Sequence, residues 1–513
     1  MIIETTGGKL RGVATGAVHG FLGIPYAAPP VPPFRFLAPR PPAPWAGVRE
    51  ATGFANQAAQ LLFAFLDPAL ANDPAQDENR AFHQGVADPL TPYGEDCLAL
   101  NVWTPAATGK RPVMVWLHGG GFASGSGSWG VWTGETLAAQ QDVVVVTLNH
   151  RLNIFGYLSL QDHGGAAHGY VPNAGMLDIV MALEWVRDNI AAFGGDPGNV
   201  TIFGQSGGGM KVGTLLAMPA ASGLFHKAIL QSGPPLRAVP RDRAAEVADR
   251  ALAHLGCGVA GLQSVSVAAL LAAFAAAGEG SPGTPRQFGP VVDGASLPRH
   301  PFDPDATPLA AGVPMLIGAT SEEITSLQGF RDPSIFTIAS DALVDRVAAS
   351  CGITSAAADA LVASYRAARP EKSPARLYAA IASDRQFGFG SIVLAERQAA
   401  QAPVFAYRLE WQSPAAGGRY GAPHNLDLPL IFGRDRAPGV TGVGTAHHAL
   451  SAAMQQAWGN FARTGNPNHA GLPDWPAYDT ARRATMMFDT ACKAIDDPNR
   501  AERLAQAKLP PRP

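Results

Sequence analysis

The chain has 513 residues, of which 47% are hydrophobic and 15% charged, and its formal net charge is −3. This composition supplies a large core and excludes a disordered chain. The balanced charge predicts no nucleic-acid partner, and the longest apolar stretch, residues 267–277, is shorter than the roughly 18 residues of a membrane span, so we also expect no membrane partner.

The first residues, MIIETTGGKLRG, lack the basic and apolar regions of a signal peptide. The four cysteines lie far apart and form no CxxC pair, which argues against a zinc site and against a disulfide scaffold. These features predict a cytoplasmic protein in a reducing compartment.

Short apolar runs rich in β-branched residues are typical of strands buried on both faces of a mostly parallel sheet. They occupy residues 113–117, 143–148, 200–203, 228–230, 315–317 and 404–409. Between them, residues 174–190 show apolar side chains at helical spacing, with Asn173 as the candidate N-cap. Strands that alternate with helices predict a wound α/β sheet.

One predicted strand ends directly in a run of glycines, in the sequence VMVWLHGGGF (113–122). Consecutive glycines let backbone N–H groups approach a substrate oxygen, so Gly120 and Gly121 are candidate oxyanion donors. His118 is interpreted as structural, because it stands at the strand end before the glycines.

A rival motif follows at once, since Gly125, Gly127 and Gly130 satisfy the G-x-G-x-x-G pattern of dinucleotide sites. It does not directly follow a predicted strand, which disfavours a nicotinamide cofactor. We therefore expect no cofactor.

The sequence VTIFGQSGGG (200–209) places Ser206 in a G-x-S-x-G pattern between a predicted strand and a predicted helix over 210–218. Such a turn exposes the serine hydroxyl and strains its backbone. The helix N-terminus offers N–H groups to a developing anion, so Gly207 is the third candidate oxyanion donor. Ser206 is the candidate nucleophile.

At this point the chain resembles the type-B carboxylesterases, on the motifs GEDCLALNVWTP (94–105), HGGGF (118–122) and FGQSGGG (203–209). Further matching segments span nearly the whole chain. The resemblance implies an α/β-hydrolase fold with a mostly parallel sheet, helices on both faces and helical insertions over an active-site gorge. It also implies a Ser-Glu-His triad without metal or cofactor, and a small-molecule ester as substrate.

The resemblance implies one domain over residues 1–513. Its expected parts are an N-terminal meander (1–110), a catalytic core (111–235), helical insertions (236–400) and a C-terminal core portion (401–500).

The family's acid follows a strand in an Asp-Glu-Gly sequence, and its match here is Glu322-Glu323-Ile324. Residue by residue, Glu323 takes the place of the acid. Because neighbouring side chains in an extended backbone point opposite ways, only one of the two glutamates can face the histidine. Glu322 stays the alternative.

The family's histidine loop matches GAPHNLDLPLIFG (421–433), which gives His424 as the candidate base. The alternatives His447, His448 and His469 are interpreted as surface or structural residues.

Several residues depart from the family pattern or support it. Gln205 replaces the usual Glu before the nucleophile, which weakens the case for cationic substrates, and Gly207 replaces the usual Ala, which predicts a looser backbone at that donor. Ser232 matches a family serine beside the triad. Lys211 is unusual, and the sequence assigns it no role.

Two further matches are structural. Arg35 and Glu95 match a family salt bridge that ties the N-terminal meander to the core. Cys97 matches a cysteine that is disulfide-bonded in secreted members, but residues 1–96 contain no partner for it.

The substrate pocket is inferred from Gln205, Phe122, Phe288 and Leu327, the last three at the places of family acyl-pocket residues. Residues 61–66 are a candidate lining of the gorge mouth, with core packing as the alternative. An apolar gorge favours neutral, hydrophobic esters. The same machinery could cleave carbamates or activated amides, and a catalytically silent binding module is disfavoured by the complete triad. The sequence indicates no oligomeric state.

Overall fold

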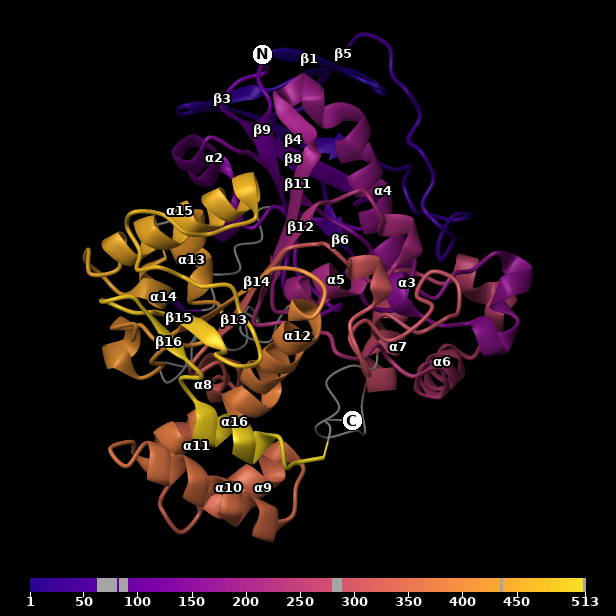
Figure 1. The fold of residues 1–513 in the computed structure, drawn as a ribbon. Coiled ribbons are helices and arrows are strands. Elements are labelled where there is room, and N and C mark those ends of the chain that lie inside the picture. The colour runs from indigo at the N-terminus through magenta and orange to yellow at the C-terminus, as the bar shows by residue number, and fades with distance from the viewer. Residues whose placement is uncertain (62–80, 83–90, 279–287, 434–436, 511–513) are drawn as a thin grey trace.

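The computed structural model describes residues 1–61, 81–82, 91–278, 288–433 and 437–510. Within these ranges an eleven-stranded sheet runs through the centre of the molecule (Figure 1). In order across the sheet its strands are β16 (Lys493–Asp496), β15 (Ala484–Phe488), β14 (Val404–Leu409), β13 (Met315–Thr320), β12 (Lys227–Gln231), β11 (Gly195–Gln205), β9 (Arg111–Leu117), β10 (Val144–Leu148), β8 (Ala99–Thr104), β4 (Val18–Pro25) and β3 (Val13–Thr15).

The middle of this sheet is parallel and its two edges are antiparallel. Neighbouring strands run parallel from β10 through β9, β11, β12, β13 and β14 to β15, whereas β16, β8, β4 and β3 pair in the antiparallel sense. Five of the six predicted apolar runs lie inside one of the parallel strands, and the sixth, 143–148, starts one residue before β10, so these predictions are confirmed. The carboxyl ends of the parallel strands all lie on the same side of the sheet, and α/β folds place their functional sites at these strand ends.

Helices cover both faces of the sheet. Successive strand residues point to opposite sides, so the apolar strands present side chains on both faces, and the helices bury them. On β9, Val113 and Val115 belong to one buried cluster, whereas Met114 and Trp116 belong to the other. The first cluster includes residues of α3 (Asn153–Tyr157), α4 (Ala174–Asn189), α5 (Gly207–Leu215), α6 (Arg241–Leu255), α7 (Val267–Gly278) and α12 (Phe389–Ala399). The second includes residues of α2 (Glu135–Gln141), α13 (Asp427–Phe432), α14 (Pro438–Thr441) and α15 (His448–Thr464).

A third buried cluster forms a helical lobe at one end of the molecule (Figure 1). It joins α8 (Ile324–Gly329), α9 (Leu343–Cys351), α10 (Ser355–Ala368), α11 (Pro374–Ser383) and α16 (Arg500–Gln506). The N-terminal part adds small sheets from β1 (Ile2–Thr5), β2 (Gly8–Arg11) and β5 (Val48–Glu50), and from β6 (Gln57–Ala58) and β7 (Tyr93–Gly94). The segment predicted as helical insertions therefore supplies helices of two clusters together with β13. The domain limits stay a prediction.

Two helix starts differ from the sequence prediction. Asn173 does not cap α4 through its side chain. Its amide group instead exchanges two hydrogen bonds with the backbone of Val291, at 2.8 and 2.9 Å. The helix after the nucleophile begins at Gly207 rather than at residue 210, because the three glycines after Ser206 already adopt the helical conformation.

The predicted pair of Arg35 and Glu95 is present, with 2.6 Å between Nε and Oε1. Arg35 also donates to the carbonyl oxygens of Leu262 and Val265, at 3.0 and 2.8 Å. The pair therefore ties the N-terminal meander to the segment between α6 and α7. The four cysteines are free, including the buried Cys97, as the missing partner predicts.

In the described part of the chain, no single helix is both long and apolar enough to cross a membrane. Taken together, α9 and α10 pass the same test of length and composition, with a bend of 112° between them.

Candidate active site

Ser206 stands in the sharp turn between β11 and α5. Its backbone angles, φ 58° and ψ −123°, lie where L-residues are strained, as expected for a nucleophile at a strand-to-helix turn. The turn is held by backbone hydrogen bonds: Ser206 N–H donates to the carbonyl oxygen of Gln231 at 2.8 Å, and its own carbonyl accepts from Met210 N–H at 3.0 Å. The neighbouring strand β12 therefore fixes the position of the serine.

The glycine loop after β9 lies directly against this turn. Gly120 and Gly121 take positive φ angles of 85° and 64°. A Cβ added to Gly207 would lie 2.2 Å from the carbonyl oxygen of Gly121 and 2.4 Å from its nitrogen. The structure thus brings the backbone of two candidate oxyanion donors into contact. A side chain at Gly207 would therefore require the glycine loop to shift. The looser backbone expected at this donor stays a prediction.

Glu323 and His424 are hydrogen-bonded to each other across the ends of β13 and β14. The bond joins Oε2 of Glu323 to Nδ1 of His424, and both side chains are buried. Glu323 Oε1 accepts a second hydrogen bond from the N–H of Thr320 at 2.8 Å. The carboxylate is thereby fixed on both oxygens and holds Nδ1 of His424, whereas the other ring nitrogen, Nε2, lies 3.1 Å from Nε2 of Gln205.

Glu322 points away from this pair. It is only 1% exposed, and it contacts Arg376 Nη1 at 3.0 Å and Lys372 Nζ at 3.3 Å. Its Oε2 also accepts from the N–H of Ala422 at 3.2 Å. Of the two candidate acids, Glu323 is the one that contacts His424. Glu322 instead links the loop that follows β13 to α11, through its ion pair with Arg376.

The remaining histidines considered from the sequence occupy other surroundings. His447 and His448 lie at the start of α15, and His469 contacts the carbonyl oxygen of Ala453 at 3.0 Å. His118 is buried and stacks on His150, with ring centroids 4.9 Å apart.

Gln205 is buried against the imidazole of His424. Its Nε2 lies 3.1 Å from Nε2 and 3.3 Å from Nδ1 of the ring, which places His424 beside the turn that carries Ser206. On the ring's face, Phe387 stacks at 5.0 Å between centroids. The sequence identified Gln205 as a departure near the site but not its contact with the base, and it gave no signal for Phe387.

Asp427 lies behind the pair of Glu323 and His424 and was not found from the sequence. It is fully buried, and its Oδ2 accepts from Gln231 Nε2 at 2.7 Å. Burial, together with the nearby charge of Glu323, raises the pKa of Asp427 to about 6. Its place three residues after His424, on the first turn of α13, is the only signal that could have marked it.

Ser232 follows β12 at the same edge of the sheet, with a positive φ of 49°. Its N–H donates to the carbonyl oxygen of Gly318 at 2.8 Å. Its buried Oγ has no hydrogen-bond partner among the described atoms. The supporting role expected from the sequence stays a prediction.

The candidate pocket residues come from separate elements. Phe122 packs against Tyr157 at 5.0 Å between centroids, and a Cβ on Gly289 would lie 3.4 Å from its ring, so the segment that carries Phe288 reaches it. Leu327 lies on α8, one turn after Glu323. Of the candidate gorge-mouth residues 61–66, all but Leu61 fall outside the described residues.

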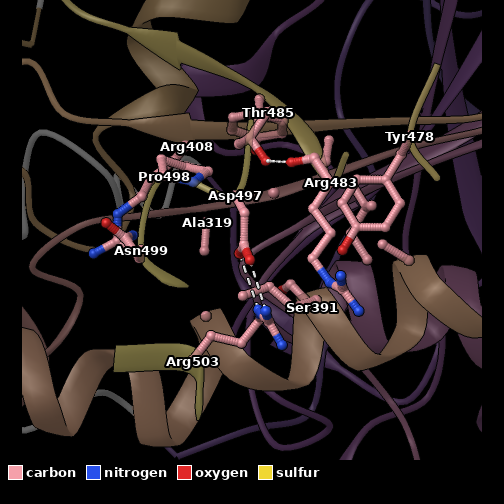
Figure 2. Close-up of a pocket in the computed structure, with 17 residues that line it drawn as sticks. Ala319, Ser391, Arg408, Tyr478, Arg483, Thr485, Asp497, Pro498, Asn499 and Arg503 are labelled. Carbon is pink, nitrogen blue, oxygen red and sulfur yellow. Dashed lines mark hydrogen bonds and ion pairs between the residues drawn. The ribbon is translucent and has the colours of Figure 1, made fainter. Parts of the chain in front are cut away.

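A separate cavity of about 550 Å³, including its opening to solvent, lies between β13, β14, β15, α12 and α16. Figure 2 shows the carboxylate of Asp497 paired with the guanidinium of Arg503, at 2.6 Å, and Arg483 beside Tyr478. Its three arginines each pair with a carboxylate, in the pairs Arg408–Asp384, Arg483–Glu396 and Arg503–Asp497. None of the three candidate triad residues lines this cavity.

Neither metal ligands nor the rival glycine motif change this description of the site. In the described ranges, no group of three or more His, Cys, Asp or Glu side chains is arranged to hold a metal ion. Gly125 packs where a Cβ would lie 2.2 Å from Nδ1 of His118, and Gly127 where one would lie 2.7 Å from the carbonyl oxygen of Leu148. Close packing accounts for both glycines.

Comparison with known proteins places this arrangement in a family. The profile of the Carboxylesterase family matches residues 1–506. The chain is 37% identical to the para-nitrobenzyl esterase of Bacillus subtilis, over 98% of this chain and 97% of the relative. The chain belongs to the carboxylesterase family. It is also 34% identical to the phenmedipham hydrolase of Pseudarthrobacter oxydans, over 93% of this chain and 92% of the relative.

Solved structures agree. A carboxylesterase of Geobacillus stearothermophilus is 40% identical, with a TM-score of 0.83 over 98% of this chain and 99% of that one. A thermophilic PNB esterase has a TM-score of 0.81 at 33% identity, over 99% of both chains. The resemblance inferred from the motifs and the α/β-hydrolase fold are thus confirmed, and this carboxylesterase is a carboxylic ester hydrolase that acts on small-molecule esters.

Proposed function

We propose that this carboxylesterase cleaves neutral, hydrophobic esters through an acyl-enzyme intermediate on Ser206. His424 takes the proton of Ser206 Oγ as the oxygen attacks the ester carbonyl, and Glu323 orients the imidazole and stabilises its charged form. The N–H groups of Gly120, Gly121 and Gly207 hold the tetrahedral oxyanion. His424 then protonates the leaving alcohol, and water releases the acid by the same route.

The hydrogen bond between Glu323 and His424, at the sheet edge that also carries the strained Ser206, supports this proposal most directly. The apolar side chains of Phe122, Phe288 and Leu327 support a neutral, hydrophobic substrate. Carbamates are the second candidate, favoured by the likeness to a phenmedipham hydrolase. We also propose a cytoplasmic location and no nucleic-acid or membrane partner, as predicted from the sequence.

A panel of p-nitrophenyl esters, p-nitrophenyl carbamates and anilides tests the substrate class. We expect kcat/KM to be highest for the esters, to be lower for carbamates, and to be lowest for anilides, whose leaving groups are poor. Carbamates turned over faster than every ester would reverse the order of the two candidate functions.

The charge preference of the site gives a further prediction. Because Gln205 is neutral and buried against His424, no carboxylate at this position attracts a cation. We expect a neutral butyrate ester to exceed butyrylcholine by at least about tenfold in kcat/KM. Gln205→Glu should narrow this gap and move the acid limb of the pH profile upward, because a carboxylate favours the protonated imidazole.

Equal kcat/KM for butyrylcholine and its uncharged isostere in the unsubstituted enzyme would contradict this expectation. It would indicate that another anion faces the substrate. Glu322 is a poor candidate for this anion, because it is already paired with Arg376 and Lys372. Asp67, at the expected gorge mouth, lies outside the described residues and would be the next candidate.

A further inference from the structure

Lys211 lies in the second turn of α5, five residues after Ser206, and is fully buried. Its Nζ donates a hydrogen bond of 2.8 Å to the carbonyl oxygen of His118, and it lies 5.6 Å from the centroid of the Phe122 ring. Within the described residues the structure records no carboxylate paired with Lys211. Because a buried ammonium without a counter-ion is costly, its presence argues for a role other than stability.

The groups that face Lys211 are bases rather than acids. His118 follows β9 and His150 follows β10, and their stacked rings each hold Nδ1 at 2.9 Å from the next residue's carbonyl oxygen. Burial lowers the pKa of both imidazoles, and the charge of Lys211 lowers it further. Beyond His150, Arg151 is neutralised by Asp178 at 2.6 Å. Lys211 therefore supplies the charge of this cluster.

The carbonyl that Lys211 binds belongs to the residue immediately before the Gly119–Gly120–Gly121 loop. This loop has no side chains of its own with which to fix its position. Its backbone rests against Gly207, the first residue of α5. Lys211 ties the start of the same loop to the next turn of the same helix. Both connections join the loop to the element that carries the third candidate donor.

We propose that Lys211 is a positioning residue of the oxyanion hole, whose ammonium group holds the glycine loop at the distance from α5 at which the N–H groups of Gly120, Gly121 and Gly207 converge on one oxygen. This inference rests on the proposed function. It assigns a role to a residue that touches neither substrate nor triad. Lys211 would stabilise the transition state rather than the bound substrate, because the oxyanion forms only after the serine attacks.

The protonation state of Lys211 gives the proposal a pH dependence. Burial lowers the pKa of Lys211 to about 7, so the ammonium form predominates below that pH and the neutral amine above it. Charge-assisted hydrogen bonds are about twice as strong as neutral ones. The bond to His118 therefore weakens as the pH rises through neutrality, and kcat should fall there while KM changes less.

Lys211→Met tests the proposal, because it removes the ammonium and keeps most of the apolar stem. Lys227→Met is the matched control. Lys227 is also buried, at 8% exposure, but it stands at the amino end of β12, whereas Ser206 follows the carboxyl end of the neighbouring strand β11. We expect Lys211→Met to lower kcat for p-nitrophenyl butyrate about 10- to 100-fold, with KM changed less than about threefold. The alkaline fall in kcat should disappear, whereas Lys227→Met keeps both kcat and the profile.

An aryl trifluoromethyl ketone provides a second measurement, because addition of Ser206 Oγ to its carbonyl leaves an oxyanion in the hole. Its inhibition constant should rise in Lys211→Met by about the factor lost in kcat/KM. The inhibition constant of the unfluorinated ketone should be the same in the variant and the unsubstituted enzyme. Lys211→Gln, which keeps a neutral donor, serves if the Met variant does not fold, and its kcat should show no alkaline fall.

A kcat of Lys211→Met within twofold of the unsubstituted enzyme would overturn the proposal. So would equal losses in Lys211→Met and Lys227→Met, or an alkaline limb that persists in Lys211→Gln. The two proposals fail in different ways. An active Ser206→Ala variant would refute the proposed function itself. A fully active Lys211→Met variant together with an inactive Ser206→Ala variant would refute only the role of Lys211.

Discussion

Replacing Ser206 by Ala should lower kcat for p-nitrophenyl acetate and butyrate by about 10⁴- to 10⁶-fold, because the acyl-enzyme can no longer form. The fold should persist, since the turn at Ser206 is held by its backbone bonds to Gln231 and Met210 and not by its hydroxyl. Initial rates and melting temperature together check both expectations. The residual rate should be the one that the oxyanion donors and substrate binding supply without a nucleophile.

A matched control is Ser222→Ala, which removes an exposed hydroxyl sixteen residues further along the chain. It should retain full activity. Covalent labelling by an organophosphate, followed by mass spectrometry, should occur in the Ser222→Ala variant and be lost in Ser206→Ala. A Ser206→Ala variant that kept more than a tenth of the activity would refute the assignment of the nucleophile.

The elements predicted best are those whose residues are determined by burial alone. The runs in β9 to β14 are apolar because both faces of a parallel strand are covered, and this pattern needs no knowledge of the partner. The helix starts were predicted less well. Asn173 has the composition of an N-cap, but its amide bonds to Val291, 118 residues away in sequence, which no local pattern reveals.

The candidate site shows the same division. Ser206 and the glycine loop are recognisable because a strained turn and an open backbone demand particular residues locally. By contrast, the contact of Gln205 with His424 spans 219 positions, and Asp427 reaches the site only through the packing of α13. The function of such residues depends on what the fold brings beside them. Lys211 was an unexplained residue in the sequence for this reason.

The pair Glu322 and Glu323 gives the second large expected effect, because the two neighbours have opposite surroundings. Glu323→Gln should lower kcat by about 10²- to 10⁴-fold, since the imidazole of His424 loses the anion that orients it. Its amide can still accept the hydrogen bond from Thr320, so the melting temperature should change little.

Glu322→Gln should do the reverse. It leaves Arg376 and Lys372 without their buried carboxylate, which should cost about 1–2 kcal/mol of unfolding free energy, because both cations are partly exposed and recover hydration. Its kcat should stay within a few fold of the unsubstituted enzyme. Measuring kcat and thermal unfolding for both variants separates the two roles: a loss of kcat in Glu322→Gln with an active Glu323→Gln would mean that the register of the acid loop is wrong by one residue.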